Sequence, residues 1–356
     1  MDKVHELRKT LHYIPELSGM EIKTAETIKN FLKHNTGLKI VDMGTFFYAV
    51  HYEGKEYKNI AFRADMDAIP GENGAYHGCG HDGHSAALAG LALRIDNLKL
   101  NKNIFLLFQP AEEIGKGAEI CLKMLDIEKI DEIYGWHNIP QYKEGQILLR
   151  NGSFACASKG ITIKFAGKQC HAAYPETGIN PSFIIARLVE KLDEFIDKNL
   201  YSAPVLATIV NINVGSVNFG ISAGYGEVSM TLRARFIYDL DKLLNMILAF
   251  SEAESKKEGI ELRYDIFDEF PDTVNDDSLY IKTRKMLERE GFDYTLLSEP
   301  LRWSEDFGYY AKKTKGFFYG IGVGEKHPAL HTQKYEFNDA ILDKAIDVMK
   351  KIAESE

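Results

Sequence analysis

The sequence is poor in cysteine and has no long apolar run. It contains 4 cysteines in 356 residues, too few for the disulfide framework that stabilises small secreted domains. No uninterrupted apolar stretch reaches the roughly 20 residues that a membrane-spanning helix needs. The first residues include acidic side chains with no apolar run behind them, which argues against an ordinary signal peptide. We therefore expect a cytoplasmic protein without a membrane partner.

Positive charge is also scarce. Lys and Arg total 43 against 52 Asp and Glu, which gives a formal net charge of -9. Because neutralisation of phosphates drives nucleic-acid binding, this balance argues against a nucleic-acid partner. It still allows a local basic pocket for a carboxylate. Hydrophobic residues make up 45% of the chain, enough for a large core, and two domains are the default expectation at this length.

Short apolar segments bounded by Gly, Pro, Asn or Asp alternate with helical patterns along much of the chain. Strands are expected at 39–42, 48–52, 59–64, 103–108, 132–136 and 317–323. Helices are expected at 24–34, 85–97 and 118–125. Strands interleaved with helices predict an α/β fold with a mostly parallel sheet.

The middle of the chain has a different order of elements. Segments between 158 and 267 follow the order β-α-β-β-α-β, which is the ferredoxin-like arrangement. The α/β pattern resumes after this region. We therefore predict one domain made of residues 1–157 and 268–356, with a ferredoxin-like α+β domain of residues 158–267 inserted into it.

The most informative motif is HGCGHDGH at residues 77–84. Cys79 and His81 lie two residues apart, and the flanking glycines let the backbone come close to a bound ion. Thiolate and imidazole both suit zinc-like metals. The alternative is a Gly-rich turn with a buried cysteine and solvated histidines.

Two adjacent acids, Glu112 and Glu113, follow the strand expected at 103–108. Adjacent side chains diverge, so that one acid can bind a metal while its neighbour faces a substrate. The alternative is an acidic helix N-terminus, where Glu complements the helix dipole. His137 and His331 also follow expected strands, and either one alone would more often be structural.

Their joint placement favours a metal site, because ligands bind at the carboxyl ends of strands in an open α/β sheet. The candidate ligands are Cys79, His81, Glu113, His137 and His331. Five ligands are too many for one tetrahedral ion, but two divalent ions about 3.5–4 Å apart would use them all if a ligand or hydroxide bridges. Zinc is the first expectation, and manganese, cobalt or nickel are the alternatives.

At these residues the sequence resembles the dinuclear-metal aminoacylase and carboxypeptidase family. Within it, the closest branch contains hippurate hydrolases, indole-acetyl-amino-acid hydrolases and N-acetyl-diaminopimelate deacetylases. The resemblance covers nearly the whole chain and is carried by LHYIPEL (11–17), RADMDA (63–68), CGHD (79–82), QPAEE (109–113), WH (136–137), Gly167 with HAAYP (171–175), SEDF (304–307) and LH (330–331). It implies metal-dependent hydrolysis of the amide bond of N-acyl amino acids, with N-acetyl-diaminopimelate among the candidates, or of small peptides.

The resemblance implies the same five metal ligands and adds further roles. Glu112 would be the general base and Asp67 a residue that orients the site. The inserted domain would be a lid that also forms a homodimer, and its His171 would steady the oxyanion, often in the partner subunit's site. Asn218 and Arg233 match positions that contact the substrate carboxylate. The simpler interpretations of these last three are a loop histidine, a turn asparagine and a strand-surface arginine.

Two departures from the family concern substrate choice. The segment between Asp67 and Cys79 is shorter than the family usually has, and Gln169-Cys170 stands before His171 where the branch commonly has small residues. Both lie near the expected substrate pocket.

Two other classes of protein compete with this interpretation. In a cysteine hydrolase, Cys79 would be the nucleophile and His81 its base, but the other three candidate ligands would then have no role. A non-enzymatic metal-binding protein would have no need of the acid at Glu112.

Overall fold

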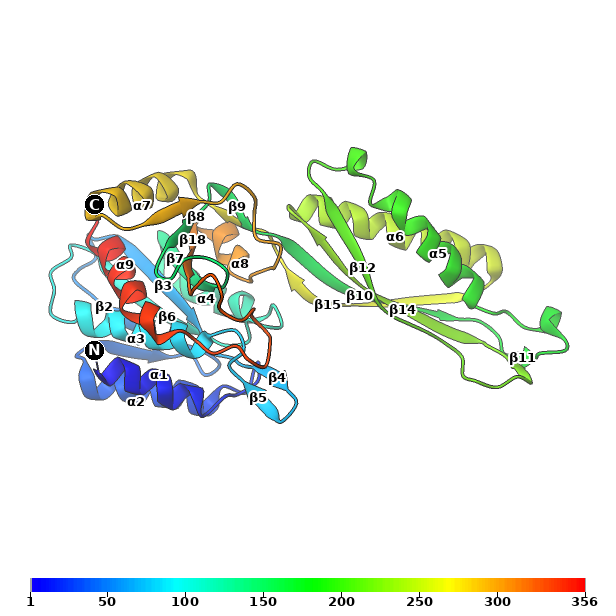
Figure 1. Ribbon diagram of the computed structural model, residues 1–356, viewed down its shortest axis with the longest axis horizontal. Helices are drawn as coiled ribbons and strands as arrows, with labels where there is room; N and C mark the ends of the chain where they lie inside the picture. The colour runs from blue at the N-terminus through cyan, green and yellow to red at the C-terminus, as the bar shows by residue number, and fades with distance from the viewer. Residues whose placement is uncertain (1, 356) are drawn as a thin grey trace. The chain divides into compact units, whose positions relative to one another are not determined.

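The computed structural model describes residues 2–355, which form two compact units (Figure 1). Unit 1 consists of residues 2–154, Thr273–Pro300 and 305–355, and unit 2 consists of Ala155–Asp272 and Leu301–Ser304. Unit 2 therefore includes a short late segment that lies outside the expected insertion of residues 158–267.

Unit 1 is built on an eight-stranded sheet with the order β1-β2-β6-β3-β7-β18-β8-β17. Its strands are β1 (Lys39–Asp42), β2 (Phe47–His51), β3 (Asn59–Asp65), β6 (Asn103–Gln109), β7 (Glu132–Ile139), β8 (Ile147–Leu149), β17 (Tyr294–Leu296) and β18 (Lys315–Gly322). The neighbours β6, β3, β7 and β18 are parallel, so the predicted α/β fold with a mostly parallel sheet is confirmed. Because these four strands share a direction, their carboxyl ends meet at one edge.

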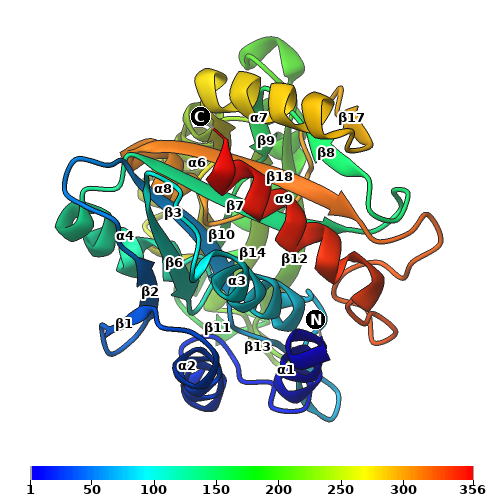
Figure 2. The same cartoon turned by 90° about the vertical axis from the view of Figure 1, so that its left-hand side faces the viewer.

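Helices cover both faces of this sheet. One face carries α1 (Asp2–His12), α2 (Ile22–Asn35), α3 (His81–Ile95), α7 (Asp277–Glu290) and α9 (Leu342–Glu354), which share one hydrophobic core with it. The other face carries α4 (Gly117–Glu128) and α8 (Gly308–Lys313). Figure 2 shows α3 and α9 crossing the near face of the strands. The remaining elements of unit 1 are β4 (Ile69–Gly71), β5 (Gly74–Tyr76), β9 (Gly152–Ala155), β16 (Thr273–Asn275) and the short helix η3 (Asp339–Ile341).

Small residues allow α3 to lie at the centre of its layer. The helix is almost entirely buried and rich in Ala and Gly. A Cβ atom at Gly90 would lie 2.4 Å from Cδ1 of Ile346 on α9, and one at Gly83 would lie 2.2 Å from the ring of Phe337. This close packing fixes the first turn of α3, which begins at His81.

Unit 2 has the predicted ferredoxin-like order of elements. They are β10 (Ala157–Ala166), α5 (Ser182–Phe195), β12 (Val205–Val214), β14 (Tyr225–Ala234), α6 (Ile237–Glu258) and β15 (Glu261–Phe270). The strands form an antiparallel sheet of order β12-β14-β10-β15 with its own hydrophobic core. The additional elements are β11 (Cys170–His171), β13 (Ile221–Ser222) and the short helices η1 (Pro175–Thr177) and η2 (Lys198–Leu200).

Within residues 2–355, none of the helices has the length and apolar character to cross a bilayer.

Gly117 offers a test of the packing that holds the β6–α4 turn. A Cβ atom there would lie 1.7 Å from the carbonyl oxygen of Pro110. We expect Gly117→Ala to lower the free energy of unfolding by about 1–3 kcal/mol or more, because the backbone must move, as measured by urea denaturation. Gly37→Ala is the control, since its Cβ would lie an ordinary 3.5 Å from Asp96 Oδ1. Equal midpoints for both variants would contradict this account.

Candidate metal centre

The five predicted metal ligands come together in unit 1. Two groups made only of these predicted ligands place one ligand atom of each member within 4.8 Å of the others. The first group is Cys79, His81 and His137, and the second is Cys79, Glu113 and His331. The thiol of Cys79 belongs to both groups, so the geometry suits two neighbouring cations with a shared sulfur ligand.

A glycine turn at the start of α3 places the first two ligands. Gly80 has φ of 90°, a left-handed conformation that glycine adopts without strain. A Cβ atom there would also lie 2.4 Å from Oδ1 of Asn138. The turn therefore directs Cys79 and His81 toward the end of β7 and requires glycine for two separate reasons.

One ring nitrogen of His81 has hydrogen-bond partners, and the other has none. Its Nδ1 lies 3.0 Å from the carbonyl oxygen of Asp67 and 3.1 Å from Asp67 Oδ1. Its Nε2 is buried without a hydrogen-bond partner, 3.8 Å from Oε1 of Glu113, which is also buried and unsatisfied. A cation between these two atoms would satisfy both, and this is the local observation that fits a metal.

The electrostatics of His81 favour a positive charge at this point of the site. Burial by itself lowers the pKa of His81, but the carboxylates of Asp65, Asp67 and Glu113 outweigh it and raise that pKa to about 10. Without a metal, the imidazole would hold an extra proton as the counter-charge. A divalent ion would replace that proton.

Cys79 lies between two histidines. Its Sγ is 3.4 Å from Nε2 of His137 and 3.4 Å from Nε2 of His331. His137 Nδ1 donates to the carbonyl oxygen of Asn138 at 2.8 Å, which leaves the Nε2 lone pair facing the sulfur. Burial, followed by the charges of nearby carboxylates such as Glu113, raises the pKa of the Cys79 thiol well above its usual range. Nearby cations would reverse this effect and favour the thiolate.

Two residues at the site have left-handed backbones that non-glycine residues rarely adopt. Ala111 has φ of 53° and His331 has φ of 62°. Hydrogen bonds hold both in place: the Ala111 N–H donates to Oε1 of Glu21 at 2.7 Å, and the His331 N–H donates to the carbonyl oxygen of Gly78 at 2.8 Å. Such strain persists where the surrounding structure over-determines it, typically at functional sites.

Asp67 connects two of the candidate ligands. Its Oδ1 faces Nδ1 of His81, while its Oδ2 accepts the backbone N–H of Glu113 at 2.9 Å and the Ser18 hydroxyl at 2.7 Å. One carboxylate thereby orients an imidazole and the backbone of a ligand residue. This placement fits the orienting role that the sequence resemblance implies.

Glu112 is buried beside other acids. Burial raises the pKa of Glu112 well above its usual range, and the charges of Glu305, Glu113 and Asp306 add to the effect. Its Oε1 accepts the backbone N–H of Asp306 at 3.4 Å. A carboxylate with a raised pKa is a stronger base, which suits proton transfer near neutral pH.

The structure adds residues that the sequence analysis did not assign to the site. His84 Nδ1 lies 2.6 Å from Oδ1 of Asp65, and Asp65 Oδ2 lies 3.7 Å from Nε2 of His81. Spacing offered a signal here, because His84 stands three residues after His81 and so shares its helix face. Arg63, Glu305 and Asp306 are also buried at the site, within the RADMDA and SEDF motifs.

The three predicted substrate contacts all lie in unit 2. His171 is exposed on β11, and Asn218 lies in the loop before β13, the strand that pairs with β11. Arg233 is on β14 and donates to the carbonyl oxygen of Arg302 and to Oγ of Ser304, both at 3.1 Å.

Within a single unit 2, Arg233 lies far from His171 and Asn218. Gly224, just before β14, accepts the N–H of Gly167 near β11, so this end of the strand lies next to His171. Arg233 is eight residues further along β14 than Tyr225, about 26 Å at 3.3 Å per residue. Unit 2 of a single chain therefore brings His171 and Asn218 together but not Arg233.

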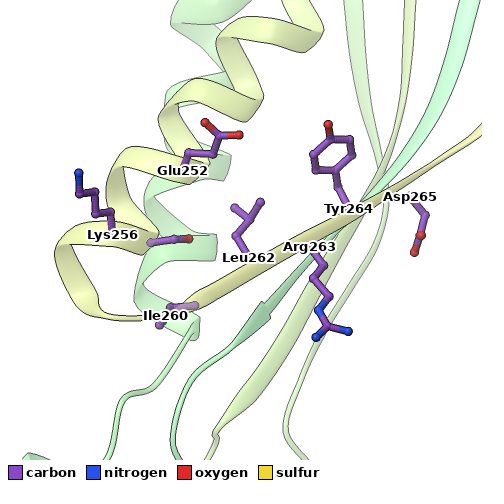
Figure 3. A pocket seen from close by; sticks show the side chains of 8 residues that line it. Glu252, Lys256, Ile260, Leu262, Arg263, Tyr264 and Asp265 are labelled. Atoms are coloured by element: carbon purple, nitrogen blue, oxygen red, sulfur yellow. The ribbon is translucent and has the colours of Figure 1, made fainter.

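A different pocket of unit 2 lies between α6 and β15 (Figure 3). Leu262 and Tyr264 point to the α6 side of the strand, whereas Arg263 and Asp265 point to the other side. Its lining carries charges of both signs and contains none of the predicted site residues.

Comparison with known proteins identifies the family. The sequence profile of peptidase family M20/M25/M40 matches residues 61–355, most of the chain. The chain belongs to this family.

Relatives and solved structures cover nearly the full length of this M20 family member. It is 28% identical to an N-acetyldiaminopimelate deacetylase of Exiguobacterium sibiricum, over 93% of each chain. It is 30% identical to an N-acetyl-L-cysteine deacetylase of Bacillus subtilis, over 91% of this chain and 81% of the relative. The structure of a dinuclear metal-binding M20 peptidase of Bacillus subtilis superimposes with a TM-score of 0.83 at 23% identity, over 99% of this chain and 97% of that one.

The shared sulfur predicts how metal stoichiometry responds to substitution. We expect the protein to bind two zinc ions, His331→Ala to lose one, and Cys79→Ala to lose one or both because its thiolate serves both groups. Metal analysis after zinc loading and gel filtration measures this directly. Cys121→Ala, at another buried cysteine of unit 1, is the control and keeps two ions. Full stoichiometry in Cys79→Ala would exclude the shared-ligand arrangement.

Proposed function

We propose that this M20 family member is a metal-dependent amidohydrolase that cleaves the amide bond of N-acyl amino acids or small peptides. The observation that carries the proposal is the pair of ligand groups sharing Cys79 beside the buried acid Glu112. The named activities of the relatives, deacetylation of N-acetyldiaminopimelate and of N-acetyl-L-cysteine, support N-acyl amino acids as the substrate class.

The proposed cofactors are two divalent ions held by the five ligands described above. Mixed thiolate, imidazole and carboxylate ligands favour zinc, with manganese, cobalt or nickel as alternatives. When bound, such ions polarise a carbonyl group and make a nearby water more acidic.

Glu112 would carry the proton during the reaction. It takes a proton from the attacking water and delivers it to the nitrogen of the leaving amine. Its raised pKa suits both steps, because the acid must hold the proton between them. Asp67 holds the ring of His81 and the backbone of Glu113 in place during both steps.

His171 would donate a hydrogen bond to the oxyanion. Its Nδ1 accepts the backbone N–H of Ala173 at 3.0 Å, which assigns the proton of the neutral ring to Nε2. A donor aimed at an oxyanion contributes roughly 2.7–4 kcal/mol to the transition state. Asn218 and Arg233 would bind the substrate carboxylate, Arg233 through its guanidinium.

Glu112→Gln tests the proposed base. The amide keeps the shape of the side chain but cannot accept the proton, so we expect kcat to fall by at least about 100-fold while two metal ions remain bound. The assay follows amine release from a panel of N-acetyl amino acids and hippurate. Glu113→Gln is the contrasting variant and should lose metal.

A chelator separates this proposal from its rivals. Metal-dependent turnover is lost on chelation and recovered with a divalent ion, whereas a cysteine hydrolase using Cys79 and His81 would keep its activity. The raised pKa of Cys79 and the contact of His81 Nε2 with Glu113 already disfavour that pair. A binding protein would show no turnover with any metal or substrate.

We also propose that the protein is a homodimer formed through unit 2. The edge strand β12 exposes Ile209, Val210 and Ile212, with Val210 66% exposed. An open edge with apolar side chains favours pairing with another strand. In a dimer, His171 of one chain and Arg233 of the other would contribute to the same site, although these two residues lie far apart within one chain.

Val210→Glu combined with Ile212→Glu should convert the dimer to a monomer, because charges would be brought into the apolar contact. Light scattering after gel filtration measures the mass. Ile281→Glu on α7, an apolar residue that is also about half exposed, is the control and leaves the mass unchanged. A monomeric wild type would rule the dimer out.

A cytoplasmic location without nucleic-acid partners completes the proposal. The four cysteines lie within residues 2–355 and form no disulfide there, which suits a reducing compartment, and the net charge of -9 disfavours nucleic acid.

A further inference from the structure

Arg63 on β3 is one of the most deeply buried charged groups in unit 1, and it has several anionic partners. Its side chain is 1% exposed. Nη1 contacts Oδ2 of Asp65 at 2.5 Å, and Nη2 contacts Oε1 of Glu305 at 2.8 Å and Oδ1 of Asp306 at 2.7 Å. Its Nε donates to Oε1 of Gln109 at 2.8 Å. The planar guanidinium therefore holds groups from β3, β6 and the segment before α8 in fixed directions.

The contacts of Asp306 connect Arg63 to the proposed base. Gln109 Nε2 donates to both carboxylate oxygens of Asp306 at 3.0 and 2.8 Å, and the N–H of Ala118 donates to Oδ2 at 2.8 Å. The side chain of Asp306 is thus bound on all sides, which fixes its backbone. Its own N–H donates to Oε1 of Glu112 at 3.4 Å.

The three carboxylates around Glu112 need a positive charge in addition to the ions proposed for the five metal ligands. Carboxylate oxygens of Glu112, Glu305 and Asp306 lie within 4.8 Å of one another, a geometry that could hold an ion. The guanidinium of Arg63 already neutralises two of the three by direct contact. Without it, like charges would push the segment of Glu305 and Asp306 away from Glu112.

We propose that Arg63 is a positioning residue for the general base. By holding Glu305 and Asp306, it aims the N–H of Asp306 at Glu112 and so fixes the carboxylate that moves the proton. This inference rests on the proposed function, because it takes Glu112 as the base. Arg63 also contacts Asp65, whose Oδ2 lies 3.7 Å from Nε2 of His81. Nδ1 of His81 and the backbone N–H of Glu113 are held by Asp67, so metal analysis of the variants separates an effect on Glu112 from an effect on the ligands.

Arg63→Lys is the principal test. Lysine keeps the positive charge but is a point charge that cannot hold several partners in a planar fork. Misplacing a catalytic group by about 1 Å can cost 100-fold in rate, so we expect kcat per metal-loaded enzyme to fall at least about tenfold. KM should change by less than about threefold, and two metal ions should remain bound. A merely structural role would lower stability but leave kcat of the folded, metal-loaded fraction intact.

Arg150→Lys is the matched control. Arg150 is another buried arginine of unit 1, and it donates to the carbonyl oxygens of Ser153, Leu297 and Ser298. We expect this variant to lose stability and keep its kcat.

Asp306→Asn is the second variant, and it decides the question if Arg63→Lys does not fold. It keeps the backbone N–H but turns a donor toward Gln109 or Ala118, so the segment shifts and the same selective loss of kcat is expected. The inference is overturned if the wild type is active, Glu112→Gln is inactive, and the folded variants at 63 and 306 keep kcat within about threefold. It is also overturned if their loss of rate follows loss of metal. A wild type without metal-dependent hydrolysis would instead refute the proposed function itself.

Discussion

Burial of negative charge at one edge of the sheet is the constraint on which the rest of unit 1 depends. Five acids there are at most 6% exposed: Asp65, Asp67, Glu112, Glu305 and Asp306. Burying a carboxylate is costly unless a cation or hydrogen-bond donors compensate. The fold supplies one permanent cation, Arg63, and several backbone N–H donors. The remaining demand is met by metal ions in the proposed enzyme, and by an extra proton on His81 without them.

This constraint explains why the site is formed from so many separate segments. Parallel strands bring their carboxyl ends to one edge, but a strand end offers only one or two side chains to a shared centre. The loops after β6 and β18 must therefore turn sharply, and Ala111 and His331 take left-handed backbones to do so. Hydrogen bonds from the backbone N–H groups of these two residues to Glu21 and Gly78 offset the strain.

The predicted ligands followed from local sequence because each lies within a few residues of a strand end or helix start. The sheet topology brings the ends of the parallel strands to one edge, as expected from the sequence. Cys79, Glu113 and His331 therefore meet although they are far apart in the chain. The ferredoxin-like order of unit 2 was equally visible, since strands such as β10 alternate buried and half-buried residues.

Other features had no local signal. Arg63 contacts Asp306 across 243 positions, and a single Arg in a strand does not reveal such a partner. Helices α1, α7 and α9 were not expected either. The helix α9 did have a local signal, because residues such as Ile346 and Met349 alternate with charged ones at helical spacing. The sequence could not show that Arg233 lies a strand length from His171, because this depends on the register of β14.

The double role of Asp67 has a consequence for how the protein acquires its metals. Asp67 orients the ring of His81 and the backbone of Glu113 through contacts internal to the chain, so these contacts do not depend on a bound ion. Part of the ligand geometry would then be set by the fold itself, unlike in zinc fingers, whose folding requires the ion. Divalent ions of similar size would exchange at these ligand groups, with selection left to ligand softness and supply. The metal content of an isolated sample would consequently reflect the growth medium as much as the polypeptide.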